Sequence, residues 1–346
     1  WGVECHPNND VYVTDTTEDR VQIFTTNGNF IAKFGNGNRA GSLPGQFQYP
    51  NDVALNSKGE LFVSDTNNDR ISVFSSSGAP LFSFTGGAGG FDGVDGIAFN
   101  SSDYIYAVDS YHNRVQIFSP TGQYIGVFGE PGTGNGQFAN PARVAINSTN
   151  HVFVTDANNN RVQIFSPIGQ YLGQFGGGQG GFDIPWGIAI NSSDHIYVTD
   201  LNNGTIHIFN PNGVFIKNFG SYSGPANPGE FTSPYGIDFD AYGNVFIADS
   251  DNQTINIYSA NGEFLTSFGE SGYREGNFLY PTGFAISKSG SLFVIDYNLN
   301  WLQIFNIGMP PQVPVLQLIS PATGQSNNVL LKWASACYAT TYNLYR

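Results

Sequence analysis

The feature of this sequence that most constrains its fold is an internal repeat that returns about every 44 to 50 residues. Seven short apolar runs each end in an aspartate, as in VYVTD, LFVSD and IYAVD. The aspartates are Asp15, Asp65, Asp109, Asp156, Asp200, Asp249 and Asp296. Short apolar runs rich in Val, Ile, Tyr and Phe and bounded by turn residues predict β-strands.

Three more strand-like segments accompany each of these runs. A segment with Gly or Ala precedes it (GIAIN), an xxIF segment follows it, and in six copies a fourth segment ends in Phe (YLGQFG). Turn sequences such as TNGN and NPNG join the segments, and a Gly-rich connector that ends in Pro leads to the next copy. Four short strands per unit describe one blade of a β-propeller, so the sequence predicts an all-β fold.

The series P-x-G-I-A-I, I-Y-V-T-D, N-x-R-V-Q-I-F and F-G resembles the NHL repeat, over roughly residues 1–306. The resemblance implies a seven-bladed β-propeller as a first domain, residues 1–308, with a six-bladed ring as the alternative. Propellers carry many unrelated activities, so this resemblance says more about fold than about function.

Four copies place an arginine five residues after the aspartate, although the whole chain has only 13 Lys and Arg residues. The aspartate ends the second strand of the blade and the arginine opens the third, so both flank one tight turn. A carboxylate there can accept turn N–H groups and pair with the guanidinium. We interpret these residues as structural pairs, with a ring of ligand-binding charges as the alternative: Asp15 with Arg20, Asp65 with Arg70, Asp109 with Arg114, and Asp156 with Arg161.

The charge of the chain excludes some partners. Its net charge of −14 disfavours nucleic acid, because binding a phosphate backbone requires clustered positive charge. No apolar run reaches the length of a transmembrane helix.

The start at Trp1, with neither Met nor signal peptide, is typical of a processed or truncated chain. The two cysteines, Cys5 and Cys337, are expected to be unrelated thiols, with a disulfide between them as the alternative.

Five Asn-x-Ser/Thr sequences are candidate glycosylation sites. Three are expected in exposed turns between the first and second strands of a blade, and two in turns after the second strand. They are Asn100, Asn147, Asn191, Asn203 and Asn252.

One face of the ring is a candidate ligand-binding face. The connectors and the turns after each aspartate emerge on this face, and the other turns emerge on the opposite one. Aromatic side chains around a hub can bind a peptide or a sugar. The alternative is that Trp186 and Tyr235 only cap the hub and pack on neighbouring blades. The ligand-face candidates are Trp1, Arg143, Trp186, Tyr235 and Tyr297.

The seventh copy lacks a recognisable fourth strand after Phe305. An open blade edge exposes unpaired backbone groups, which soluble proteins avoid. Three strands are candidates to close it: one upstream of Trp1, the segment 313–318 (VPVLQL), or a strand of a neighbouring molecule. The last would produce a homopolymer by strand sharing.

Residues 309–346 form a linker and then a segment that resembles the start of a fibronectin type III domain. Its marks are the SPATG turn, Trp333 in a second strand and YNLYR as a third. The resemblance implies a partial β-sandwich-like segment, too short for a core of its own. Such modules are typical of extracellular and cell-surface proteins.

Catalytic chemistry has weak support in the sequence. Relatives of this repeat that are lyases or lactonases use His or carboxylate clusters at the hub, but the five histidines here are expected at different levels of the ring. We predict no catalytic residue, no metal site and no cofactor, with calcium on the Asp/Asn-rich turns as the alternative.

The sequence therefore predicts a non-enzymatic, secreted or cell-surface glycoprotein that binds proteins or glycans or assembles with itself, as an adhesin or as a sheath, layer or filament subunit. The alternatives are a ligand-sensing domain and a hub-site lyase or hydrolase. No nucleic-acid partner and no transmembrane segment are expected.

Overall fold

The computed structural model describes residues 2–35, 40–176, 181–222, 229–307, 330–331 and 342–345, the last two ranges as backbone strands only. Several expectations concern residues outside these ranges. They are the placement of Trp1 and Cys337, the closing strand at 313–318, and the fibronectin-like features of 309–346 apart from the two short strands.

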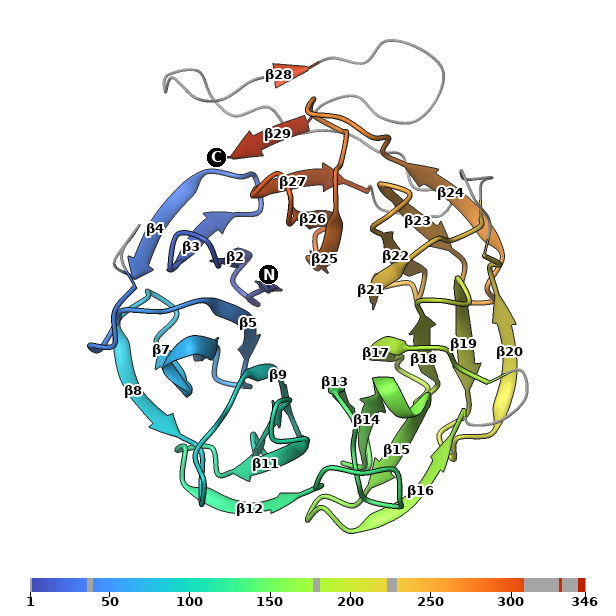
Figure 1. Ribbon diagram of the computed structural model, residues 1–346. Helices are drawn as coiled ribbons and strands as arrows, with labels where there is room; N and C mark the ends of the chain where they lie inside the picture. Colours follow the sequence, from blue (N-terminus) through green and yellow to red (C-terminus); the bar gives the residue numbers. More distant parts are fainter. Residues whose placement is uncertain are drawn as a thin grey trace.

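The described residues form seven antiparallel sheets that surround a central hub like blades (Figure 1). The prediction of an all-β, seven-bladed propeller is therefore confirmed, and the six-bladed alternative is wrong. Blades 1 and 2 contain β1 (Val3–Cys5), β2 (Asp10–Asp15), β3 (Arg20–Thr25), β4 (Phe30–Gly35), β5 (Pro50–Leu55), β6 (Leu61–Asp65), β7 (Arg70–Phe74) and β8 (Pro80–Thr85). Blades 3 and 4 contain β9 (Val94–Phe99), β10 (Ile105–Asp109), β11 (Arg114–Phe118), β12 (Tyr124–Phe128), β13 (Pro141–Ile146), β14 (Val152–Asp156), β15 (Arg161–Phe165) and β16 (Tyr171–Phe175).

Blades 5 and 6 contain β17 (Pro185–Ile190), β18 (Ile196–Asp200), β19 (Thr205–Phe209), β20 (Phe215–Phe219), β21 (Pro234–Phe239), β22 (Val245–Asp249), β23 (Thr254–Tyr258) and β24 (Phe264–Phe268). Blade 7 contains β25 (Pro281–Ile286), β26 (Ser291–Asp296), β27 (Trp301–Asn306), β29 (Tyr342–Tyr345) and β28 (Leu330–Leu331). Two short 3-10 helices, η1 (Thr66–Asn68) and η2 (Ala157–Asn159), form the turns between the second and third strands of blades 2 and 4.

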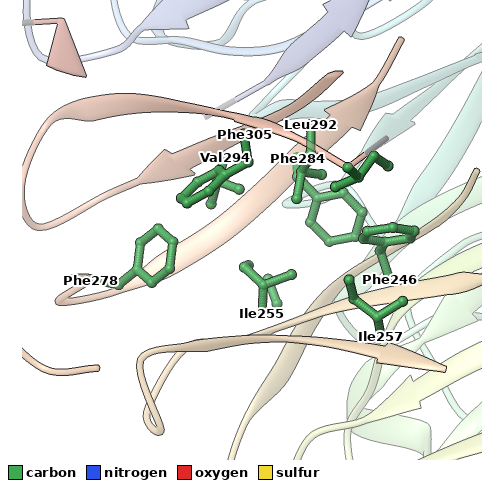
Figure 2. Packing of buried hydrophobic residues seen from close by; sticks show 10 residues of the cluster. Phe246, Ile255, Ile257, Phe278, Phe284, Leu292, Val294 and Phe305 are labelled. Atoms are coloured by element: carbon green, nitrogen blue, oxygen red, sulfur yellow. The ribbon is translucent and has the colours of Figure 1, made fainter. Parts of the chain in front are cut away.

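The core lies between neighbouring blades rather than within each one. Between blades 6 and 7, Phe246, Ile255 and Ile257 pack against residues of β25, β26 and β27, as Figure 2 shows. The second strand of most blades is buried at every position, because both of its faces meet a neighbouring sheet. Each blade therefore depends on both of its neighbours for burial of its apolar faces.

A phenylalanine in each connector fills the space between two blades, which we call the connector socket. Phe138 is fully buried, with its ring centroid 6.5 Å from that of Phe128 and 5.6 Å from that of Phe165. Gly129, which follows Phe128, has a φ of 94°, and a Cβ there would lie 2.5 Å from the Phe138 ring. This close approach explains the recurring F-G sequence. The connector phenylalanines are Phe47, Phe91, Phe138, Phe182, Phe231 and Phe278.

In the structure the outer edge of β27 in blade 7 is paired with β29, which was not among the three candidates. β29 lies antiparallel to β27, with Leu302 opposite Tyr345 and Ile304 opposite Asn343. Figure 1 shows β29 on the outer edge of the ring beside β27. The closing strand thus comes from the YNLY sequence near the end of the chain.

Cys5 is a free thiol in the structure. No helix among the described residues is long and apolar enough to span a membrane.

Candidate functional site

The repeated aspartates and arginines lie at the same turn and form ion pairs. In each of blades 1 to 4 the arginine guanidinium lies 2.7 Å from the aspartate Oδ2. In blade 4 the Asp156 carboxylate also accepts the Ala139 N–H, and Arg161 donates to the Gly134 and Gln137 carbonyls. The pair therefore attaches the connector to the blade, and its charges face protein rather than an open surface.

In the three blades without the arginine, other groups approach the aspartate. In blade 5 the His207 ring lies 3.3 Å from Asp200 and shares a hydrogen bond with Thr205. In blade 6, the Asn252 amide donates to Asp249 at 2.6 Å. The aspartate keeps its contacts with the connector backbone in every blade from 2 to 7.

Aromatic side chains form a continuous series on the face where the connectors emerge. The Trp186 and Tyr235 rings are 5.7 Å apart, Tyr235 and Tyr280 are 5.7 Å apart, and Tyr280 and Tyr297 are 6.4 Å apart. Tyr49 of blade 2 continues the series through a side-chain hydrogen bond with Tyr297. We call these five residues the aromatic arc.

The arc brings together three of the candidates expected from the sequence. The Arg143 guanidinium lies over Trp186, 5.9 Å from the ring centroid, and Trp186 in turn contacts Tyr235. Tyr297 contacts Tyr280, which in turn contacts Tyr235. The arc rings contact one another across blade boundaries, which agrees with the alternative that these aromatic residues only pack on neighbouring blades. However, none of the five arc residues is fully buried. They therefore present part of their ring surface to solvent, while Tyr235 and Tyr280 share a side-chain hydrogen bond.

Tyr49 and Tyr280 were missed from the sequence. Both precede the proline that opens the first strand of a blade, in the sequences QYPND and LYPTG. The repeat pattern pointed instead to the residue after that proline and to the residue after each aspartate. A rule that also treats the residue before that proline as lining the hub would have found them.

A cavity of ≈ 350 Å³ lies at the hub, below the arc. Its walls include the apolar side chains of Val53, Ile97 and Phe284, and the charged groups Glu4, Asp52 and Arg143 also line it. Its size is within the range of cavities that bind small ligands or a single side chain. The first strands of the blades build it, because they are the innermost strands of a propeller.

Three carboxyl groups near the hub have raised pKa values, and the sequence analysis did not single them out. Burial, together with the neighbouring Asp238 and Asp52 carboxylates, raises the pKa of Glu4 to about 8. Burial also raises the pKa of Asp238 to about 6. Burial raises the pKa of Asp52, while Arg143 and the Ile97 N–H oppose the rise.

The structure brings the histidines to different places, and the described residues contain no group of three or more His, Cys, Asp or Glu side chains arranged to hold a metal ion. His112 contacts Asp109 at 3.1 Å in one turn, while His207 lies within β19. His151 and His195 lie in turns of the opposite face, beside Asn147 and Asn191.

The candidate glycosylation sites differ in exposure. Asn203 is exposed, although its amide nitrogen donates to Asp200 at 2.8 Å. Asn100, Asn191 and Asn252 are partly buried. The turn that carries Asn147 is exposed at Ser148 and Thr149, as expected, but Asn147 itself is only 6% exposed. Its Oδ1 accepts the N–H groups of Thr149 and His151, so the side chain folds back over its own turn.

Comparison with known families identifies the repeat. Residues 47–74, 138–165 and 182–209 match the model of the NHL repeat. The chain contains NHL repeats. Each matched NHL segment begins at a connector phenylalanine and ends at the phenylalanine of a third strand. The two rings lie 5.4 to 5.6 Å apart. One NHL repeat therefore spans the contact that joins two blades.

Solved structures similar to this NHL-repeat chain include enzymes and another kind of protein. A streptogramin B lyase is 14% identical, with a TM-score of 0.65 over 85% of this chain and 89% of the other. Virginiamycin B lyase from Staphylococcus aureus is 14% identical, with a TM-score of 0.63 over 85% of this chain and 90% of the other. U3-55K is 15% identical, with a TM-score of 0.66 over 85% of this chain and 87% of the other. At these identities the similarity shows the propeller fold alone. No curated protein matches the sequence.

Proposed function

We propose that this NHL-repeat propeller is a non-enzymatic binding module whose partner docks on the aromatic arc. The observation that carries the proposal is the continuous contact series from Trp186 through Tyr235 and Tyr280 to Tyr297. Partly exposed Trp and Tyr side chains supply large contact areas with hydroxyl or N–H groups at their ends, and they dominate many binding sites. Trp186 and Tyr235 of the arc also line the hub cavity, whose volume can receive one side chain.

The charge around the arc favours a protein segment that carries Lys or Arg. Glu4 and Asp52 line the cavity, Asp251 lies near Tyr280, and Asp95 lies near Tyr49. The chain as a whole has a net charge of −14. A cationic side chain could lie against the rings and near these carboxylates. A glycan, which lacks such a charge, is the alternative partner.

The proposal assigns no catalytic residue and no cofactor. The arc offers partly exposed ring surface. A hub-site lyase or hydrolase is the competing function, and its support is the fold that the chain shares with two named lyases. Calcium on the Asp/Asn-rich turns stays a prediction, and elemental analysis of the purified protein tests it.

We also propose that the protein acts outside the cell. The support is the exposed sequon at Asn203 and the resemblance of residues 309–346 to the start of a fibronectin type III domain. Fractionation of the natural source with an antibody against the propeller tests this location.

The binding proposal is tested with a soluble peptide library and an immobilised glycan array, both probed with the full chain. Trp186→Ala and Tyr280→Ala are expected to weaken binding of a selected peptide at least tenfold while the melting temperature changes little. Tyr104→Ala is the control, because Tyr104 is an exposed tyrosine near a turn of the opposite face. If Trp186→Ala, Tyr280→Ala and Tyr104→Ala all bind the selected peptide equally well, the partner binds elsewhere on the propeller. If only glycans are selected, the partner is a sugar rather than a protein.

Self-assembly is a second candidate function, and it has one specific observation in its favour. β29 pairs with β27 over only three residue pairs, whereas the outer strand of blade 3 pairs over four, and 35 residues separate β27 from β29. A short strand on a long connection can pair with β27 of another molecule instead of its own.

Light scattering of the full chain after size exclusion tests this assembly. Strand exchange predicts species larger than a monomer that disappear in a Leu344→Pro variant, because proline removes a backbone N–H from β29. A monomer at all concentrations, or oligomers that persist in the variant, would overturn it.

A further inference from the structure

The innermost strands of the blades pair with the second strands in one register, so equivalent residues form rings around the hub. Val53, Val144 and Ile188, for example, each lie opposite the central valine of the second strand. The residue before this position is glycine in five blades, at Gly2, Gly96, Gly187, Gly236 and Gly283. In blades 2 and 4 it is Asp52 and Arg143. A ring of glycines is therefore interrupted by two side chains of opposite charge.

A second ring, two residues further along each innermost strand, also carries charge. Five blades have alanine there, at Ala54, Ala98, Ala145, Ala189 and Ala285, whereas blade 1 has Glu4 and blade 6 has Asp238. Glu4 and Asp52 come from neighbouring blades and both line the hub cavity. The Asp52 charge contributes to the raised pKa of Glu4, so the two carboxyl groups are close. One part of the cavity wall is therefore acidic.

Arg143 supplies the positive charge of the same cavity from blade 4. Its guanidinium lies 5.9 Å from the Trp186 ring centroid, and its Nη1 donates to the Ala142 carbonyl at 2.9 Å. Within the described part of the chain, Arg143 forms no ion pair, unlike the arginines of the turns. Its charge nevertheless opposes the rise in the pKa of Asp52. The cation therefore lies near the acidic wall without contacting its carboxylates.

A buried hydroxyl group adds to the polar groups of the cavity that lack a partner. Oγ1 of Thr282 is buried and makes no hydrogen bond to any described residue, and Thr282 lines the cavity from blade 7. Buried polar atoms without a partner are rare in native proteins, since each one costs desolvation energy. The remaining wall includes the apolar side chains of Val53, Ile97 and Phe284. Polar groups that a ligand can satisfy thus surround an apolar space.

The two signs of charge select the class of ligand. A simple anion would meet the Glu4 and Asp52 carboxylates, and a simple cation would meet the Arg143 guanidinium. A molecule with both an ammonium and a carboxylate group can pair with both walls. The cavity volume of ≈ 350 Å³ accommodates an amino acid together with an apolar side chain.

We propose that the hub cavity binds a free α-amino acid with an apolar side chain. The ammonium group lies between Glu4 and Asp52, and the carboxylate accepts hydrogen bonds from Arg143. The side chain of the ligand packs against Ile97 and Phe284. This inference goes beyond the proposed protein partner, because the ligand is a small zwitterion inside the hub rather than a segment docked on the aromatic arc.

Calorimetric titration of the full chain with L-phenylalanine and L-leucine tests the site. Saturable binding to one site per chain is expected for both. Two analogues of phenylalanine each lack one charge: 2-phenylethylamine has no carboxylate, and 3-phenylpropanoate has no ammonium group. Each analogue is expected to bind about tenfold more weakly than L-phenylalanine, because one charge-assisted pair is lost. Absence of binding by both amino acids, or equal binding by either analogue, would overturn the proposal.

Two conservative variants assign the two ends of the ligand. Arg143→Gln is expected to weaken L-phenylalanine binding about tenfold without weakening 2-phenylethylamine binding, since the amine has no carboxylate to lose. Asp52→Asn should weaken L-phenylalanine binding without weakening that of 3-phenylpropanoate. Arg274→Gln is the matched control, because Arg274 is exposed and belongs to a connector. Equal affinity of Arg143→Gln and Arg274→Gln for L-phenylalanine would contradict the proposal.

Tyr280→Ala separates this site from the aromatic arc. Tyr280 belongs to the arc, but the described lining of the hub cavity includes Trp186 and Tyr235 and not Tyr280. The variant is therefore expected to lose peptide binding and to keep its affinity for L-phenylalanine. Loss of L-phenylalanine binding in a Tyr280→Ala chain with an unchanged melting temperature would contradict a separate site in the hub.

Discussion

Arg161 and Asp156 form a nearly solvent-free ion pair, with Nε 2.7 Å from Oδ2 and the arginine side chain 7% exposed. The equivalent pair in blade 1, Arg20 with Asp15, has the same contact but side chains that are 18% and 15% exposed. Arg161 also donates to carbonyls of the connector, and Arg20 does not within the described chain. One sequence motif therefore has two different environments.

This difference predicts unequal costs for removing the two arginines. Arg161→Ala leaves a buried carboxylate without its cation and is expected to lower the free energy of unfolding by about 3 kcal/mol. Arg20→Ala is expected to cost at most about 1 kcal/mol, because water can solvate Asp15. Urea denaturation of both variants measures the difference, and equal losses would contradict the assignment of Arg161 as a connector anchor.

The connector phenylalanines are expected to dominate the packing between blades. Phe138 is fully buried, so Phe138→Ala should lower the free energy of unfolding by about 3–5 kcal/mol through lost burial and a cavity. Ile168→Ala is the control in the same blade, because Ile168 is 82% exposed. A small change in thermal stability for Phe138→Ala would show that the blades hold together mainly by other contacts.

The hub carboxyls predict a pH dependence of stability. The pKa of Glu4 is about 8 in the folded protein and about 4.5 without the fold, so between these values the folded chain binds the extra proton. The free energy of unfolding therefore falls as the pH rises from 4.5 to 8. Glu4→Gln should match the parent near pH 4 and be more stable at pH 8, by on the order of 2 kcal/mol.

Thermal melts between pH 4 and pH 8.5 measure this effect. Glu263→Gln is the control, because Glu263 is exposed and its replacement should leave the slope unchanged. A Glu4→Gln variant with the parent's slope would mean that the Glu4 carboxyl is well solvated in the hub.

The burial of Asn147 predicts which sequon a folded glycoprotein leaves unmodified. A glycan on Asn147 would have to displace a side chain that accepts N–H groups from its own turn and is 6% exposed. Asn203 is exposed and can carry one. Peptide mapping of protein secreted from a glycosylating host should find Asn147 unmodified and Asn203 occupied. Full occupancy at Asn147 would show that the turn opens.

The sequence by itself determined the blade. Alternating apolar residues specify strands, and short turns join neighbouring strands of one blade, so these features depend on local contacts. The aspartate and arginine of one turn are five residues apart, and their pairing could be predicted for the same reason. Seven copies of the unit then indicated the number of blades.

Only the tertiary structure decided what the ring brings together. The arc joins Tyr49 to Tyr297, which are far apart in the chain, because the last blade returns to the first. Ring closure also places the Glu4 carboxyl near that of Asp238, which lies 234 residues later in the chain. No local pattern encodes these contacts, since they depend on the closure of the ring and on β29, whose pairing partner lies more than 35 residues earlier.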